Sequence, residues 1–160
     1  PYAYFTEKDF SQRLEDEQLP SYLLMVIIAT AARFSQDPYF EGRQQEVAER
    51  FCHKAWNEIC ERLFSGDDVL QITIVQATNM LAVVDFTSGR QTLAWVKIGL
   101  AIRFAQSLRL ADASPTDLTS KLNVEQKHER IMTFWSVYLL DRLVSCAPNR
   151  PPTISDNDCT

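Results

Sequence analysis

The fold is decided by residues 93–110, which read LAWVKIGLAIRFAQSLRL. Apolar side chains recur in this stretch at helical spacing, and no alternation at every second residue lasts long enough to indicate a strand. A helix that is apolar on most of its circumference is normally surrounded by other protein segments. The stretch therefore predicts a core helix in an all-α domain.

Arg103 is a charged residue in the middle of this apolar stretch. An unpaired guanidinium inside a protein costs roughly several kcal/mol, so a buried Arg103 needs a carboxylate partner. Asp141 is a candidate, because helical geometry places it on the same face of a later helix as Val137 and Val144. We predict an Arg103–Asp141 ion pair, with Glu129 as a competing partner. The alternative is that each group reaches solvent separately.

Further segments with helical periodicity lie on both sides of this stretch. Proline, glycine and Asp or Asn at their ends act as start and stop signals. Residues 69–86 contain several β-branched residues, but their length favours a helix. The predicted helices cover residues 6–18, 21–34, 39–64, 69–86, 90–110 and 124–146. The expected architecture is an irregular bundle of about six helices, with stacked antiparallel helical pairs as one arrangement.

The tryptophans bear on both the arrangement and the core. Trp56, Trp95 and Trp135 are 39 and 40 residues apart, close to the period of some helical-pair repeats, but their flanking residues scarcely match. We therefore interpret the spacing as a coincidence. Large aromatic side chains most often anchor a core, so we expect Trp95 and Trp135 to be buried rather than to stack on a ligand.

Composition and charge limit the classes of function. The chain has 160 residues with 46% hydrophobic and 23% charged residues, which fits one globular domain over residues 1–160. Its net charge of -5 has the wrong sign for binding DNA phosphates. The longest apolar stretch, residues 22–32, is too short to cross a membrane. The chain begins with Pro1 and closes without a final helix, so we expect it to be a fragment.

The candidates for metal binding and catalysis are weak. The four cysteines lack the close pairs of a zinc site, and we expect reduced thiols and no metal in this chain. Glu125 and His128 have the spacing of one half of a di-iron site, but a second copy is missing. Asp67 and Asp68 fit a helix cap better than a magnesium site. No phosphate-binding glycine loop or nucleophile elbow occurs. We predict that the chain is not an enzyme.

Two motifs in order carry a resemblance. The first is W-x3-G-x-A-x-R in the central apolar stretch, and the second spans the last predicted helix and the residues after it. Their defining residues are Trp95, Gly99, Arg103, Glu129, Arg130, Trp135, Asp141, Arg142, Arg150 and Pro151. Together they resemble the middle homology region, or regulatory domain, of fungal binuclear zinc-cluster transcription factors. The resemblance covers residues 90–158, and Arg109 and Asn149 stand where that family usually has glycine.

The resemblance implies a nuclear protein that controls transcription by RNA polymerase II. A six-cysteine zinc cluster upstream of this chain would bind DNA and hold the zinc, so this chain would touch neither DNA nor a membrane. The implied partners are other parts of the same transcription factor, co-regulator proteins or a second copy, and a small-molecule inducer. The residues of a ligand-binding pocket remain unknown.

A helical scaffold that only binds proteins is the alternative function. A parent gene that encodes two C-x2-C-x6-C motifs upstream would favour the transcription factor, and continued helical pairs without them would favour the scaffold. In both cases we expect further helices after residue 160, because several predicted helices are apolar on most of their surface.

Overall fold

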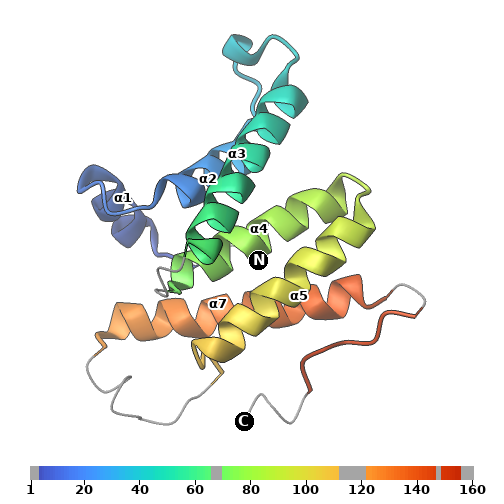
Figure 1. Ribbon diagram of the computed structural model, residues 1–160. Coiled ribbons are helices and arrows are strands. Elements are labelled where there is room, and N and C mark those ends of the chain that lie inside the picture. Colours follow the sequence, from blue (N-terminus) through green and yellow to red (C-terminus); the bar gives the residue numbers. More distant parts are fainter. Residues whose placement is uncertain (1–3, 66–69, 112–121, 147–148, 156–160) are drawn as a thin grey trace.

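The computed structural model describes residues 4–65, 70–111, 122–146 and 149–155. Within these residues it contains six α-helices, one short 3-10 helix and no strand, so the predicted all-α class is confirmed (Figure 1). The elements are α1 (Glu7–Glu15), α2 (Ser21–Ala32), η1 (Pro38–Phe40), α3 (Gln44–Phe64), α4 (Ile72–Thr87), α5 (Gln91–Ser107) and α7 (Val124–Val144).

Helix α4 is the centre of the structure. It packs against α2, α3, α5 and α7, and most of its residues are buried. Consecutive helices form antiparallel pairs, α2 with α3 and α4 with α5, and α7 runs alongside α5 in the opposite direction (Figure 1). The described helices thus follow the paired arrangement that the sequence suggested.

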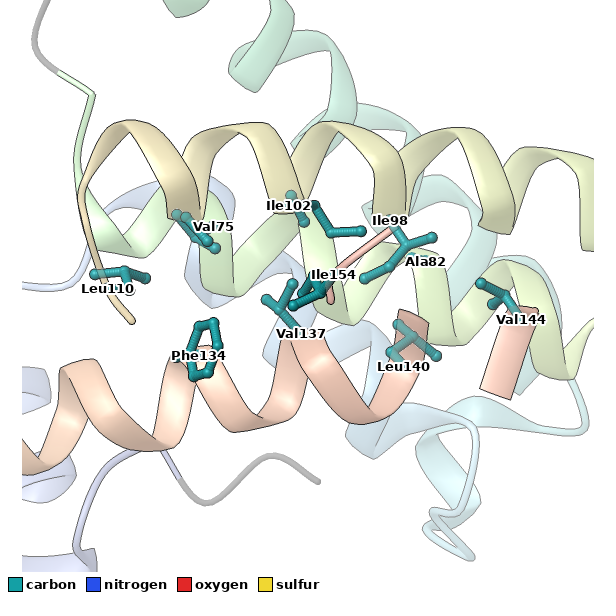
Figure 2. Close-up of a cluster of buried hydrophobic side chains, with 12 residues drawn as sticks. Val75, Ala82, Ile98, Ile102, Leu110, Phe134, Val137, Leu140, Val144 and Ile154 are labelled. Carbon is teal, nitrogen blue, oxygen red and sulfur yellow. The ribbon is translucent and has the colours of Figure 1, made fainter. Parts of the chain in front are cut away.

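Two hydrophobic clusters share α4. One lies between α4, α5 and α7, and Figure 2 shows side chains from these three helices pointing toward one another, with Ile154 from the segment after α7 among them. The other lies between α2, α3 and α4 and also includes Tyr4 and Leu19. Because α4 contributes to both clusters, for example with Val75 to the first and Leu81 to the second, it joins the two helical pairs into one body.

The prediction of a single helix over residues 39–64 was wrong at its start. Asp37 caps a 3-10 helix by accepting a hydrogen bond from the Tyr39 N–H at 2.8 Å. Glu41 and Gly42 then adopt left-handed backbone angles, with φ of 47° and 81°. Two left-handed residues in succession cannot continue a right-handed helix, so α3 begins only at Gln44. Most of its charged side chains are exposed, such as Glu49, Arg50 and Lys54.

The end of α5 has the geometry that a glycine would favour. Arg109 lies in the left-handed region with φ of 50°, and the Leu110 N–H donates to the Ala105 carbonyl at 3.0 Å. This is a helix-ending turn of the Schellman type, where glycine is the usual residue. Asn149 likewise has φ of 62°. Arg109 and Asn149, where the resembled family usually has glycine, therefore both adopt the left-handed conformation that glycine favours.

This turn gives a first prediction. We expect Arg109→Gly to raise the free energy of unfolding by about 0.5–1 kcal/mol, because glycine removes the left-handed strain at some cost in unfolded-state entropy. Arg109→Ala keeps the strain and should not stabilise the chain. Asn149→Gly should change stability by less than Arg109→Gly, because asparagine tolerates this conformation better. Urea denaturation measures all three, and a destabilised Arg109→Gly chain would contradict the assignment.

None of the helices in the described part of the chain combines the length and the apolar composition that a bilayer crossing needs.

Candidate functional site

Asp141 fastens the segment after α7 to the body of the domain. Its carboxylate is 1% exposed and accepts hydrogen bonds from the backbone N–H groups of Thr153 and Ile154, both at 2.9 Å. Ile154 is thereby held in the cluster between α5 and α7. We call residues 149–155 the strap.

Two arginines of the motif also hold the strap. Arg142 donates to the Ile154 carbonyl at 2.7 Å, and its guanidinium lies over the Tyr138 ring. Arg150 donates to the carbonyl of Gln91 at the start of α5, and its guanidinium lies 5.6 Å from the centre of the Trp95 ring. These contacts connect the strap to α7 on one side and to α5 on the other.

Arg130 joins the other end of the same helix pair. Its guanidinium donates to the carbonyls of Leu108 and Arg109 at 2.7 and 3.2 Å. The last carbonyls of a helix lack partners within it, so a cation here satisfies them and opposes the helix dipole. The second motif thus clamps α5 to α7 at both ends.

The predicted Arg103–Asp141 ion pair was wrong. Arg103 is exposed and donates to Gln106 within the same helix at 3.0 Å, while Asp141 bonds to the strap. Most of the buried residues of α5, such as Ala94 and Ile98, lie on the side of the helix away from Arg103. The competing partner, Glu129, pairs instead with Arg13.

The expectation that Trp95 and Trp135 anchor the core was also wrong. They are 40% and 42% exposed, on the outer faces of α5 and α7. Trp135 contacts Tyr138 edge-on, with ring centres 5.4 Å apart. It also belongs to a row of exposed apolar side chains along α7: Ile131, Trp135, Leu139 and Leu143.

The remaining motif residues have simpler surroundings. Pro151 is exposed in the strap, after the chain has left α7. Gly99 is half-buried, and beyond its chain neighbours and the backbone of its own helix no described atom lies within 4 Å of the position that a Cβ would occupy there. Nothing in the described part of the structure requires glycine at residue 99.

A row of buried polar side chains lies between α4 and α7. We call Gln76, Asn79, Glu129, Thr133 and Ser136 the polar seam. Gln76 donates to the Glu129 carboxylate at 2.9 Å and to the Thr133 hydroxyl at 3.1 Å. One turn further along, Asn79 donates to Ser136 at 2.9 Å and to the Tyr4 hydroxyl at 2.8 Å. The interface between these two helices is therefore polar where residues 4–19, which we call the α1 segment, cover it.

The N-terminal segment completes the polar seam. Arg13 of α1 donates to both oxygens of Glu129, at 3.3 and 2.7 Å, and also pairs with Asp9. Burial acts to lower the pKa of Arg13, but the hydrogen bonds and charges of Glu129 and Asp9 outweigh it and raise that pKa. Burial raises the pKa of the Tyr4 phenol, which therefore stays neutral in its hydrogen bonds.

Open grooves surround α1. A polar groove of about 490 Å³ lies between α1 and the start of α7, lined by Arg13, Asn123 and Glu129 among others. An apolar groove of about 530 Å³ lies between residues 4–10 and α2, with Phe10, Ile27 and Phe34 in its walls. Volumes in this range suit small ligands or inserted side chains.

A third buried acid, Asp85, lies near the end of α4, next to the turn that leads into α5. Asp85 accepts hydrogen bonds from Arg90 at 2.8 Å and from Lys97 at 2.6 Å, and Lys97 also lies over the Trp56 ring. The neighbouring groove of about 360 Å³ is bordered by Cys52, where burial raises the pKa of the thiol. The carboxylate has two cationic partners, so this cluster is a structural link between the helices.

The described residues bring no metal-binding cluster together. They contain no group of three or more His, Cys, Asp or Glu side chains placed to hold a metal ion. Glu125 and His128 are exposed, as expected of surface residues. Cys52, Cys60 and Cys146 are free thiols in the described part of the chain. Asp67 and Asp68 lie outside the described residues.

The polar seam was not predicted, although its spacing is visible in the sequence. Gln76 and Asn79 are three residues apart in an otherwise apolar stretch, so a helix places them on one face. Glu129, Thr133 and Ser136 have the matching spacing of four and three residues. Polar residues on one face of an apolar helix indicate a buried hydrogen-bonded partner, and α7 supplies it.

The comparisons with known proteins agree with the motifs. Residues 2–160 match the family model described as the fungal specific transcription factor domain. The chain is 25% identical over 164 residues to the Zn(2)-C6 fungal-type transcription factor FTF1a of Fusarium oxysporum f. sp. lycopersici, covering 98% of this chain and 15% of that protein. The relative FTF2 from the same organism gives the same identity and coverage.

A more distant relative is an uncharacterized transcriptional regulatory protein of Schizosaccharomyces pombe. It is 22% identical over 162 residues, covering 96% of this chain and 23% of that protein. The chain thus spans less than a quarter of the length of these relatives. No solved structure matches significantly. The family model covers nearly the whole chain, and the chain therefore belongs to the fungal specific transcription factor domain family.

Proposed function

We propose that this chain is the regulatory domain of a nuclear zinc-cluster transcription factor whose DNA-binding segment lies outside residues 1–160. The family match over residues 2–160, with relatives named as Zn(2)-C6 transcription factors, carries the proposal. The net charge of -5 supports it, because DNA binding needs cations that neutralise phosphates. The domain acts by binding rather than by catalysis.

The zinc of such a protein belongs to the absent segment. A six-cysteine cluster needs more thiols than the four cysteines of this chain, and the three described ones are not gathered at one place. A regulatory signal, whether an inducer or a protein partner, acts on this domain by binding one arrangement of its helices more tightly than another.

Deletion of this domain from the parent protein tests the proposal. We expect the deletion to change the output of a reporter gene at least several-fold and to leave the affinity for the DNA site unchanged. The isolated chain should not retard a labelled duplex at low salt. A chelator should abolish DNA binding by the parent but leave the melting temperature of the isolated chain unchanged. Salt-dependent DNA binding by the isolated chain would overturn the proposal.

A further inference from the structure

The α1 segment, residues 4–19, is attached to the domain differently from the other helices. Tyr4 and Leu19 at its two ends are buried, but α1 between them has no buried residue. Helix α1 does not pack extensively against any other described helix. Between the two anchors, the segment is held by the contact between Arg13 and Glu129 and by Phe5 and Phe10, which pack partly buried against the cluster between α2, α3 and α4. Arg13 keeps 20% of its side chain exposed.

The surface beneath this segment tolerates water. Its floor is the polar seam, in which the Gln76 Oε1 and Asn79 Oδ1 atoms are buried and accept no hydrogen bond from the described residues. A buried acceptor without a partner is costly, and water would satisfy both atoms if α1 moved away. Hydration of these two oxygens therefore offsets part of the free energy that is lost when the contacts of the α1 segment break.

The same surface selects the chemistry of its occupant. Glu129 is 5% exposed and presents its carboxylate to a guanidinium, so a ligand without a cation leaves a buried charge unpaired. Phe5 and Phe10 of the α1 segment pack against the neighbouring cluster between α2, α3 and α4, so the surface beneath the segment also accepts aromatic side chains. Charge and shape together fit an amphipathic segment with an arginine and neighbouring aromatic residues.

We propose that the surface covered by the α1 segment is an exchangeable docking site. The α1 segment opens while the rest of the domain stays folded, and an arginine-bearing amphipathic segment of a partner protein binds in its place. The partner's arginine occupies the position of Arg13 against Glu129. The inference does not depend on the proposed role in transcription, because it concerns only contacts within this chain.

A labelled peptide with the sequence of residues 4–19, titrated into the 160-residue chain, is the probe. The intramolecular segment competes with the peptide, so the observed affinity is the affinity of the open chain multiplied by the fraction of chains that are open. Arg13→Gln in the chain weakens that competitor, so we expect the wild-type peptide to bind the Arg13→Gln chain about tenfold more tightly than the wild-type chain. Arg62→Gln, which removes an exposed ion pair on α3, should leave the affinity unchanged.

Two peptide variants make the test independent of the folding of the chain. The Arg13→Gln peptide should bind about tenfold more weakly than the wild-type peptide. The Lys8→Gln peptide has the same net charge as the Arg13→Gln peptide, but Lys8 is exposed in the structure, so this peptide should bind like the wild type. On a Glu129→Gln chain the difference between the wild-type and Arg13→Gln peptides should fall to within about twofold.

Hydrogen exchange measures the opening directly. In the wild-type chain, the amides of α1 should exchange at least about tenfold faster than those of α4. Equal exchange of α1 and α4 would overturn the proposal, as would equal binding of the Arg13→Gln and Lys8→Gln peptides. If residues 4–19 of a second copy bound to this surface instead, the chain would be a dimer in solution and would not bind the peptide. That result would also overturn the proposal.

Discussion

Replacement of Asp141 by alanine is expected to lower the free energy of unfolding by about 4 kcal/mol, because two hydrogen bonds to a charged acceptor are lost together. The two backbone N–H groups of the strap would lose their buried partner. Ile154 would lose its position in the cluster between α5 and α7. The effect should be one of the largest that a single polar substitution produces in this chain.

Two further variants separate the role of the charge from that of the acceptor. Asp141→Asn keeps an oxygen that accepts both bonds but removes the charge, and charge-assisted hydrogen bonds are about twice as strong as neutral ones. We expect it to cost about 2 kcal/mol. Arg103→Gln changes an exposed side chain and should cost less than about 0.5 kcal/mol.

Urea denaturation gives the three free energies, and hydrogen exchange locates the change. In the Asp141→Ala chain, residues 149–155 should lose protection before the helices do. A cost for Arg103→Gln as large as that for Asp141→Ala would show that the two residues interact after all. Unchanged protection of the strap would show that Asp141 is not its anchor.

The helices were predictable because their ends carry local chemistry. The Asn123 side chain accepts from the Gln126 backbone N–H while the Gln126 side chain bonds back to Asn123, which fixes the start of α7 at residue 124 as predicted. The predicted start of α3 was wrong because Glu41, which is not a glycine, has left-handed backbone angles. An ordinary side chain gives no sign in the sequence that its backbone is left-handed.

The burial of α5 could not be predicted from its own residues. Leu93 and Val96 are 50% and 49% exposed, although they are as apolar as the buried Ile98 and Ile102. A helix that is apolar on both faces has no polar side to reveal its orientation. Arg103 marks the exposed side of α5, but the apolar residues around it favoured a buried position in the prediction.

The motif residues were recognised as a set, but their roles depend on contacts distant in sequence. Asp141 bonds to the strap after its own helix has ended, and Glu129 meets Arg13 from the other end of the chain. The packing of α4, α5 and α7 determines which groups Asp141 and Glu129 contact. This packing does not follow from the spacing of residues along the sequence.

The central position of α4 makes a second large effect testable. Leu81 is buried in the cluster with α2 and α3, and Ile98 in the cluster with α5 and α7, each 1% exposed. Truncation of a buried leucine or isoleucine to alanine costs about 2–5 kcal/mol, from lost burial and the cavity that remains. We expect Leu81→Ala and Ile98→Ala each to cost about 3 kcal/mol.

The two hydrophobic clusters should also unfold together, because α4 contributes residues to both of them. In each variant, thermal unfolding should remain a single transition at a lower temperature, whether followed by circular dichroism or by tryptophan fluorescence. The matched controls are Leu139→Ala and Ile131→Ala, which remove the same atoms from residues that are 58% and 53% exposed and should cost about 0.5 kcal/mol or less. Two separate transitions would mean that α4 does not couple the helical pairs, and that a signal received by one pair could not reach the other through it.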